Sequence, residues 1–570
     1  MMTPRPEHPL PQLRRENWLN LNGYWEFEID HGKSGLDRAL PEADRLESAI
    51  MVPFCPESIL SGVHNTDFME MIWYRRTVTI PESWQGGRVF LHFGAVDYHA
   101  RVFVNGKKVG EHRGGYSSFA LDVTDYLVSG ENVITVCAED NQRSGLQPRG
   151  KQSWCYHSQG CEYTRTTGIW QTVWLEHRPD NHIVSVKYYP DPENGKLDIH
   201  ATVTGADTLR AEAFFDGKPM GSGSGRVSGS TVHVTVPLSE IHLWEVGCGR
   251  LYDLVLTYGE DRVNSYFGLR SIRFDGMKFL LNGKSVFQRL VLDQGFYPDG
   301  IYTAPSDEDL ERDILMSQAI GFNGARLHEK IFEPRFLYHA DRLGYLVWGE
   351  HANWGLRLQD AGALHAFLPE WTEAVERDFN HPAIIGWCPF NETWDDGENA
   401  ARQLDSNLEL IYRVTKALDP TRPCIDTSGN FHTVTDIFDT HEYEQDVAIF
   451  TSFYGRDSEN GGLRTTFPAR QHYIPGQPYF VSEYGGTRWT SQKENAWGYG
   501  NAPQTEEEFL TRIKGLTDVL LDNPNHFGFC YTQLYDVEQE QNGLYTYKRF
   551  PKFPAETLRA IFGRKAAIEE

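Results

Sequence analysis

The pattern of hydrophobic and polar positions changes twice along the chain. Up to about residue 180, short stretches of alternating apolar and polar residues follow one another, as in 88–112, 116–127 and 132–140. Asn105-Gly106 lies between two such stretches and predicts a tight type I′ hairpin turn. Many short strands with Gly and Asn turns are typical of a two-sheet sandwich, so we predict a β jelly roll over residues 1–180.

A second all-β pattern follows between residues 181 and 273. Its candidate strands are 183–191, 196–205, 210–220, 231–238, 252–259 and 264–272. Their number and spacing predict an immunoglobulin-like sandwich of about 90 residues. The segment 221–230, GSGSGRVSGS, is dominated by Ser and Gly and predicts a turn or a flexible loop.

From residue 274 to 570, apolar strands alternate with amphipathic helices. Ser306 and Asp309 are spaced as a capping box before one helix, and Gly344 is a suitable stop for the next. Eight strands with intervening helices predict a (β/α)₈ barrel, although a doubly wound sheet would have a similar pattern. The candidate strands are 285–293, 324–328, 345–350, 383–392, 423–429, 436–443, 478–485 and 527–536.

Composition limits the classes of partner. The 570 residues include 54 basic and 79 acidic side chains, which gives a net charge of −25. Nucleic acids and anionic membranes require basic surfaces, so we expect neither as a partner. Hydrophobic residues make up 40% of the chain and aromatic residues 13%, as in a globular protein with a large core.

Cysteine usage and the amino-terminal sequence suggest a cytoplasmic location. The first residues contain no apolar segment like that of a secretory signal, and no apolar run is long enough to span a membrane. The eight cysteines include no zinc-type CxxC pair and are expected to be reduced. Cys155 and Cys161 are near enough in sequence that a loop disulfide stays open as an alternative.

Chemically active side chains follow the predicted barrel strands. The active sites of such barrels lie at the carboxyl ends of the strands, so these residues should meet at one rim. A Glu at a strand end is more often a cap or an ion-pair partner, but two of them after strands 4 and 7 favour catalysis. The candidates are Asp293, Arg326, His328, Glu350, Asn391, Glu392, Trp394, His441, Tyr443, Glu483, Gln533 and Asp536.

Such a rim suits a neutral substrate with many hydroxyl groups. Carboxylates and amides bind hydroxyls, and Trp and Tyr stack on sugar rings. Strands 4 and 7 lie on opposite sides of an eight-stranded barrel, so Glu392 and Glu483 form the natural pair for glycoside hydrolysis.

The chain resembles glycoside hydrolase family 2, which contains β-galactosidases, β-glucuronidases and β-mannosidases. The resemblance covers nearly the whole chain and depends on several motifs in order. They are NWLNLNGYWEFEID, IWYRRTVTIPESW, TTGIWQTVWLE, LWEVGCGRLYDLVLTYG, FLLNGKSVFQRLV, RDFNHPAIIGWCPFNE and PYFVSEYGG.

The resemblance implies a retaining double displacement without a cofactor. Glu483 would be the nucleophile and Glu392 the acid/base, with carboxyl groups about 5 Å apart. We expect burial and the charge of Glu483 to raise the pKa of Glu392. Arg326 and Tyr443 would stabilise Glu483, and Asn391 would bind the neighbouring sugar hydroxyl.

The substrate is less determined. The family's β-glucuronidases carry an Asn-x-Lys pair where this chain has Glu540 and Asn542, which disfavours a uronic acid. Gln533 stands where many relatives have Trp, and Asp293 is expected to contact sugar hydroxyls. No metal is needed, although Glu350 and His351 partly match the Mg²⁺ ligands of the large galactosidases.

We therefore predict an exo-acting hydrolase of a neutral β-galactoside, either pyranoside or furanoside. An α-L-arabinofuranosidase, a transglycosylase and a non-catalytic sugar-binding protein stay open. The long loop 147–168 is expected to reach the barrel mouth, with packing against the second sandwich as the equal alternative. Family members are commonly dimers or tetramers, so we expect a homo-oligomer.

Overall fold

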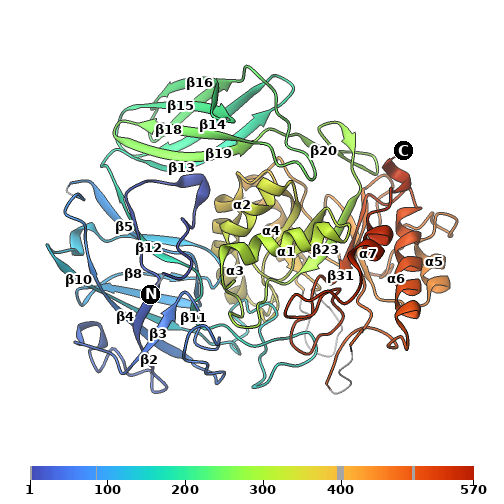
Figure 1. The fold of residues 1–570 in the computed structure, drawn as a ribbon, viewed down its shortest axis with the longest axis horizontal. Coiled ribbons are helices and arrows are strands. Elements are labelled where there is room, and N and C mark those ends of the chain that lie inside the picture. Colours follow the sequence, from blue (N-terminus) through green and yellow to red (C-terminus); the bar gives the residue numbers. More distant parts are fainter. Residues whose placement is uncertain (1–2, 85, 394–402, 491–494, 570) are drawn as a thin grey trace.

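The computed structural model describes residues 3–84, 86–393, 403–490 and 495–569. Figure 1 shows a β-rich amino-terminal part, a second sandwich above it and a barrel surrounded by helices. Among the described residues, no sheet combines strands from two of these parts: the first set ends with Arg178, the second runs from Ile183 to Gly268, and a small sheet begins at Ile272. The domain boundaries near residues 180 and 273 stay predictions.

The first sandwich has a six-stranded sheet in the order β3-β2-β4-β10-β7-β8 and a four-stranded sheet in the order β1-β12-β5-β9. Asn105 and Gly106, with φ of 51° and 78°, join β7 to β8 as a tight hairpin, as predicted. The strands are β1 Trp18–Asn20, β2 Gly23–Ile29, β3 Ser48–Val52, β4 Met71–Thr79, β5 Arg88–Phe93, β6 Val96–Asp97, β7 His99–Val104, β8 Lys107–Arg113, β9 Phe119–Asp122, β10 Glu131–Glu139, β11 Gly168–Ile169 and β12 Val173–Arg178.

The second sandwich packs a three-stranded sheet, β13-β14-β17, on a four-stranded sheet, β16-β15-β18-β19. Alternate residues of β14, β15 and β17 are buried, which is why these strands were recognisable in the sequence. The strands are β13 Ile183–Asp191, β14 Lys196–Val203, β15 Thr208–Phe215, β16 Lys218–Arg226, β17 Thr231–Pro237, β18 Leu251–Tyr258 and β19 Asp261–Gly268.

The prediction of a loop at 221–230 was wrong over its first half, which belongs to β16. Gly221, Gly223 and Gly225 alternate along this strand and face the backbone of β17. A Cβ at these positions would lie 1.9, 2.2 and 2.1 Å from carbonyl oxygens of β17. The glycines therefore permit a close approach of two strands and do not mark a flexible turn.

The third part is a barrel of parallel strands. Its main sheet has the order β26-β25-β24-β23-β31-β30-β29, and β27 pairs with β28 to continue the ring between the fourth and sixth positions. Because the first strand, β23, pairs with both the second and the last, the sheet closes in chain order and is not doubly wound. The strands are β23 Gln288–Asp293, β24 Gly324–Leu327, β25 Leu346–Glu350, β26 Ile384–Cys388, β27 Phe390–Asn391, β28 Thr427–Ser428, β29 Phe438–Glu442, β30 Tyr479–Gly485 and β31 Gly528–Thr532.

Helices cover the outside of the barrel. Helix α1 begins with the predicted capping box, in which Ser306 and Asp309 bond reciprocally, and α2 ends at Gly344 with φ of 63°. The helices are α1 Asp307–Ala319, α2 Pro334–Leu343, α3 Ala361–Asp378, α4 Asp405–Leu418, α5 Val447–Tyr454, α6 Glu506–Leu521 and α7 Ala555–Phe562. A small sheet precedes the barrel: β20 Ile272–Asp275, β21 Lys278–Leu281 and β22 Lys284–Ser285.

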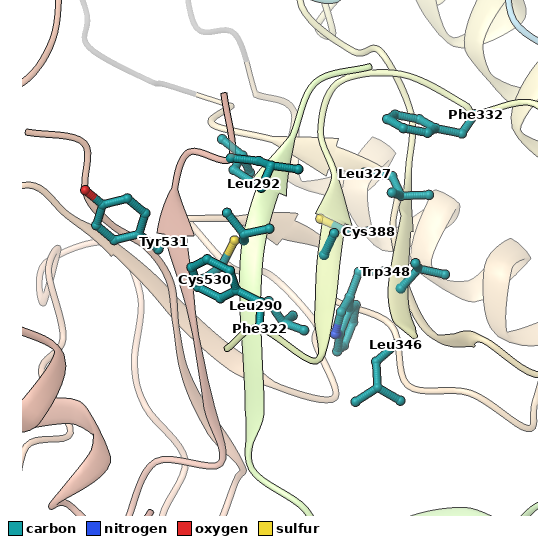
Figure 2. Close-up of a cluster of buried hydrophobic side chains, with 14 of the residues drawn as sticks. Leu290, Leu292, Phe322, Leu327, Phe332, Leu346, Trp348, Cys388, Cys530 and Tyr531 are labelled. Atoms are coloured by element: carbon teal, nitrogen blue, oxygen red, sulfur yellow. The ribbon is translucent and has the colours of Figure 1, made fainter. Parts of the chain in front are cut away.

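Buried apolar side chains fix the strands of the barrel. Figure 2 shows Leu290 of β23 and Leu346 and Trp348 of β25, the strands on either side of β24, with Cys530 and Cys388 beside them. These residues precede the polar residues at the carboxyl ends of the strands, so a packed core supports the rim of the barrel on which the candidate site residues lie. All eight cysteines are free thiols, which leaves Cys155 and Cys161 unbridged. No helix of the described residues is long and apolar enough to cross a membrane.

Candidate active site

Glu392 stands immediately beyond strand β27. The apolar residues Trp387 and Phe390 are buried in the strand region before it. The backbone of Glu392 turns into the left-handed region, with φ of 47°, and its N–H donates to the carbonyl of Ser428 at 3.0 Å. This conformation is uncommon for a residue other than Gly and often marks a functional position.

The structure brings Glu392 close to Glu483 of β30, with His441 of β29 between them. His441 Nδ1 lies 2.8 Å from Glu392 Oε1 and 3.4 Å from Glu483 Oε2. One side-chain ligand atom from each of the three residues lies within 4.8 Å of the others. The two acidic residues that the sequence paired across the barrel therefore face one another.

Both ring nitrogens of His441 have close polar partners. Its Nδ1 faces Glu392, and its Nε2 lies 3.0 Å from Ser428 Oγ. The Ser428 hydroxyl also donates to Asp439 Oδ2 at 2.6 Å, and the Arg326 guanidinium lies 3.5 Å from His441 Nε2. Burial lowers the pKa of His441, but the charges of Glu483 and Glu392 outweigh burial and raise it.

Arg326 joins Glu483 to the neighbouring strand ends. Its guanidinium donates to Glu483 Oε1 at 3.0 Å, to Glu350 Oε1 at 2.6 Å and to Asn391 Oδ1 at 3.2 Å. Tyr443 donates its hydroxyl proton to the other oxygen of Glu483. A cation and a phenol therefore stabilise negative charge on Glu483, as the sequence predicts.

Asn391 and Glu350 differ in how much hydrogen-bonding capacity they have left. Among the described residues, the buried Nδ2 of Asn391 has no hydrogen-bond partner, so it is available to a substrate oxygen. Glu350 is committed to protein partners: it accepts from Arg326 and lies 3.1 Å from His328 Nδ1. A direct role of Glu350 in substrate binding stays a prediction.

The prediction that the pKa of Glu392 is raised was wrong. Burial does raise the pKa of this carboxyl, but the hydrogen bond and the charge of His441 lower it more. The charges of Lys151 and Arg326 act in the same direction, so the pKa of Glu392 lies below its usual value. No local pattern in the sequence indicates that His441 lies against this carboxyl.

A second set of side chains forms a closed ring of hydrogen bonds beside the carboxylates; we call it the polar wall. Gln294 donates to Tyr163 Oη at 2.8 Å and to Gln533 Oε1 at 2.6 Å. Gln533 donates to Asn542 Oδ1 at 2.8 Å, Asn542 donates to Glu540 Oε1 at 2.9 Å, and Tyr163 donates to Glu540. The wall thus joins one residue of the first sandwich to four of the barrel.

Three further predictions have different outcomes. Gln533 lies in the polar wall with both ends of its amide bonded to protein, and contact with substrate stays a prediction. Asp293 accepts from the backbone of Gly295 and from Tyr535, and its expected contact with sugar hydroxyls stays a prediction. Trp394 falls outside the described residues.

The loop 147–168 reaches the barrel, as predicted. Arg149 and Gly150 donate backbone hydrogen bonds to the carbonyl of Trp354, which follows β25. The sequence singled out this loop by its length and aromatic content, but it did not single out Lys151 or Tyr163 within it. Their positions depend on contacts with segments two hundred or more residues away.

Within the described residues, Glu392, His441 and Glu483 are the group whose spacing could hold a metal ion. The Arg326 guanidinium lies against this group, 3.5 Å from His441 Nε2 and donating to Glu483, and its positive charge would oppose a bound cation. Glu350 and His351 have separate partners: Arg326 holds Glu350, and His351 Nε2 lies 3.3 Å from Glu370 Oε2.

Comparison with known proteins identifies the family. The model described as "Glycosyl hydrolases family 2, sugar binding domain" matches residues 60–179, and "Glycosyl hydrolases family 2, TIM barrel domain" matches residues 273–496. A beta-glucuronidase of Streptococcus agalactiae is 23% identical over 593 residues, covering 95% of each chain. A beta-galactosidase of Thermoanaerobacter pseudethanolicus is 26% identical over 360 residues, covering 58% of this chain and 46% of that protein.

The fold agrees with solved structures of the same kind. The beta-glucuronidase of an uncultured Clostridium sp. superposes with a TM-score of 0.78 at 22% identity, covering 97% of this chain and 99% of that one. The two family models occur in the chain order of the sandwich and the barrel described above. The chain therefore belongs to glycosyl hydrolases family 2 and is a glycosidase.

Proposed function

We propose that the protein hydrolyses β-glycosides with retention of configuration, with Glu483 as nucleophile and Glu392 as acid/base. The observation that carries the proposal is the short separation of the two carboxylates, whose facing oxygens lie within 4.8 Å of each other. Retaining glycosidases have carboxyl groups about 5–5.5 Å apart, whereas inverting enzymes need about 6.5–9.5 Å to hold a water between them.

In the first step, Glu483 Oε attacks the anomeric carbon and the bond to the leaving oxygen breaks. Glu392 gives its proton to that oxygen, so the alcohol departs neutral and a glycosyl ester of Glu483 forms. His441 Nδ1 lies 2.8 Å from Glu392 Oε1, close enough to return a proton to this carboxyl, whose pKa the hydrogen bond and charge of His441 lower. Arg326 and Tyr443 hold Glu483 in place for the attack.

In the second step, a water molecule enters on the side that the alcohol has left. Glu392, now ionised, takes a proton from the water, and the hydroxyl oxygen attacks the anomeric carbon. The ester bond to Glu483 breaks, the carboxylate regains its negative charge, and the sugar leaves with its original configuration. The unpartnered amide of Asn391 is available to the neighbouring sugar hydroxyl throughout.

For the substrate, we propose the non-reducing end of a neutral β-galactoside, either pyranoside or furanoside. Support comes from the polar wall, where Glu540 and Asn542 stand in place of the Asn-x-Lys pair of β-glucuronidases. A carboxylate in this wall would repel the carboxylate of a uronic acid. An α-L-arabinofuranoside carries no charge and is also compatible with this wall, and a non-catalytic sugar-binding role is the alternative outside hydrolysis.

A β-glucuronide is the second candidate. It is favoured by the names of relatives, among them the beta-glucuronidases of Streptococcus agalactiae and Rattus norvegicus, which match 95% and 96% of this chain. Their identities of 23% and 24% leave room for a different substrate.

A panel of nitrophenyl glycosides tests the proposal: β-galactopyranoside, β-galactofuranoside, α-L-arabinofuranoside, β-glucoside and β-glucuronide. We expect the best kcat/KM on a neutral glycoside, release of single sugars, and a first product of unchanged configuration by NMR. A preference for the glucuronide would overturn the neutral substrate, an inverted product would overturn the mechanism, and no turnover would favour a sugar-binding role. Product analysis with added acceptor alcohols separates hydrolysis from glycosyl transfer.

We also propose a homo-oligomer, a dimer or tetramer, in the cytoplasm. The oligomer is supported by the dimers and tetramers that are common in the family, and the cytoplasmic location by the eight free cysteines. Light scattering coupled to size-exclusion chromatography tests the first part; a monomer at micromolar concentration would refute it.

A further inference from the structure

A lysine of the amino-terminal sandwich lies among the strand ends of the barrel. Lys151 follows β10 in the long segment that Figure 1 shows passing from the first sandwich toward the barrel. The side chain is 7% exposed, and its Nζ stands 3.7 Å from the ring centroid of Trp354. Trp354 in turn donates its indole N–H to the carbonyl of Asn391, the residue before Glu392.

The segment is held rigidly on both sides of Lys151. Gly150, with φ of 56°, has no room for a Cβ, which would meet the carbonyl oxygen of Glu329 at 2.4 Å. Gln152 is fully buried and donates to Asp97 Oδ2 at 2.8 Å and to Tyr116 Oη at 3.0 Å. Contacts with both the barrel and the sandwich therefore fix the backbone at Lys151. Because this segment is already ordered, binding a ligand costs little conformational entropy.

The ammonium is central to the site. Burial raises the pKa of Glu329, Glu392 and Glu540, and the positive charge of Lys151 opposes burial at all three. These carboxyls follow the second, fourth and eighth strands of the barrel. The charge of Lys151 therefore acts on carboxyls at three separate strand ends of the barrel.

Lys151 nevertheless lacks an ion pair within the described part of the chain. No described carboxylate oxygen lies within 4.0 Å of its Nζ, and no described acceptor bonds to it. An ammonium has three donors, and leaving them without acceptors in a buried place is costly. Burial lowers the pKa of Lys151, but the acidic groups around it, Cys161, Glu540 and Glu392 first, raise it by more than burial lowers it. The side chain therefore stays charged.

We propose that Lys151 is a substrate-binding residue, whose ammonium donates hydrogen bonds to an oxygen of the sugar that Glu392 and Glu483 cleave. The inference rests on the proposed function of those two residues and extends it to the first sandwich. A sugar seated on the carboxylates lies beneath Nζ and offers the missing acceptors. A neutral sugar offers a hydroxyl oxygen and a uronic acid offers a carboxylate oxygen; the same ammonium would bind either one.

The test compares Lys151→Met with wild type on the best nitrophenyl glycoside of the panel. Methionine keeps the length and packing of the stem and removes the donors. Loss of one hydrogen bond from a charged donor should lower kcat/KM about 10- to 100-fold, and Lys151→Arg should recover part of it.

Lys187→Met is the matched control. Lys187 also extends from a sandwich to the barrel, where its Nζ lies 4.8 Å from the Phe379 ring and donates to the carbonyl of Leu418. We expect it to leave kcat/KM within about threefold of wild type. Thermal unfolding of each variant shows whether any loss comes from the fold.

Deoxy substrates separate contact from a general electrostatic effect on Glu392. If Lys151 binds one hydroxyl, the glycoside lacking that hydroxyl is a poor substrate for wild type but suffers little further loss in Lys151→Met. Losses that are equal for the parent and every deoxy glycoside, or a loss below threefold on the parent, would overturn the proposal.

Failure of the proposed function would be visible separately. If wild type prefers the glucuronide, the neutral substrate is wrong, and the Lys151 comparison is made between nitrophenyl glucuronide and nitrophenyl glucoside. A larger loss on the glucuronide then supports contact with its carboxylate, and equal losses refute it. If no glycoside is turned over, calorimetric binding of nitrophenyl galactoside and glucuronide is compared: weaker binding of either by Lys151→Met supports the contact, and equal binding, or none by wild type, refutes it.

Discussion

The two halves of the site are built differently. On one half, Glu392, His441, Glu483 and Arg326 form a network of charged groups in direct contact, all of them from barrel strand ends. On the other half, the polar wall joins Gln294, Gln533, Glu540 and Asn542 to Tyr163 of the first sandwich, largely through amides. In the proposed function, the charged half holds the groups that move protons and form bonds, and the wall holds groups that recognise the oxygens of the substrate.

This difference teaches where chemistry and specificity reside. Family 2 enzymes share their chemistry, so the charged half should tolerate few changes, whereas the wall can change with the substrate. Substitutions in the charged half should therefore affect all glycosides, and substitutions in the wall should affect some glycosides more than others.

The largest effect is expected from Glu483→Gln. An amide cannot form the ester intermediate, so kcat should fall about 10⁴-fold or more on every glycoside. Steady-state kinetics on the nitrophenyl panel measures this. Retention of more than a hundredth of the activity on any substrate would remove Glu483 from the nucleophile role.

Glu392→Gln should cost less and should depend on the leaving group. Nitrophenolate departs without a proton, so its glycosides should lose about 10-fold, while alkyl glycosides should lose about 10³-fold. A plot of log kcat against leaving-group pKa measures the difference. Equal losses across the series would contradict the role of Glu392 as acid.

Glu540→Gln tests the wall. It removes the negative charge and keeps one of the two acceptor oxygens that receive the protons of Asn542 and Tyr163, so a neutral sugar should lose at most about 10-fold in kcat/KM. The glucuronide should gain relative to the galactoside, because repulsion of its carboxylate is relieved. The ratio of the two kcat/KM values reports this; an unchanged ratio would place the sugar carboxylate elsewhere.

His441→Asn should move the pH profile with about a tenfold loss of rate. The hydrogen bond and charge of His441 lower the pKa of Glu392, so their removal lets burial raise it. The acid form of Glu392 then persists to higher pH, and the alkaline limb of kcat/KM should move upward in pH. A limb at the same pH as in wild type would show that His441 does not govern this carboxyl.

Glu57→Gln should leave both halves of the site active and change stability slightly. Burial raises the pKa of Glu57 to about 8, and this residue accepts from the backbone of Thr167 at the end of the long loop. A raised pKa means that the folded state holds the proton more tightly, so wild type loses stability as pH rises from about 4.5 toward 8. The unfolding midpoint should therefore fall between pH 5.5 and 8.5 by about 2 °C more in wild type than in the variant. Equal falls would place the titration elsewhere.

Much of the charged half could be predicted because its residues carry a local signature. Each of Glu392, His441 and Glu483 follows or ends an apolar strand, and sequential parallel strands bring their carboxyl ends to one rim. The wall had no such signature: Glu540 and Asn542 were noticed only as departures from a family motif. Tyr163 lies in a loop whose partner is 377 residues away in the chain.

The two clear errors have physical causes of the same kind. Gly221, Gly223 and Gly225 favour a loop by composition, yet they form a strand because the β17 backbone leaves no room for side chains. We expected the apolar residues before Glu392 to raise its pKa, but His441, which belongs to another strand, lowers it. In both cases a neighbour distant in sequence outweighed the local pattern.

The sequence by itself determined the order of sandwich, sandwich and barrel, and the pairing of Glu392 with Glu483. It could do so because hydrophobic periodicity encodes each strand and chain order encodes the closed sheet. Only the tertiary structure decided that His441 bridges the two carboxylates, that the polar wall closes through Tyr163, and that Lys151 lies over the Trp354 ring. Charge interactions and hydrogen bonds depend on distances of a few ångströms between segments that no local pattern relates.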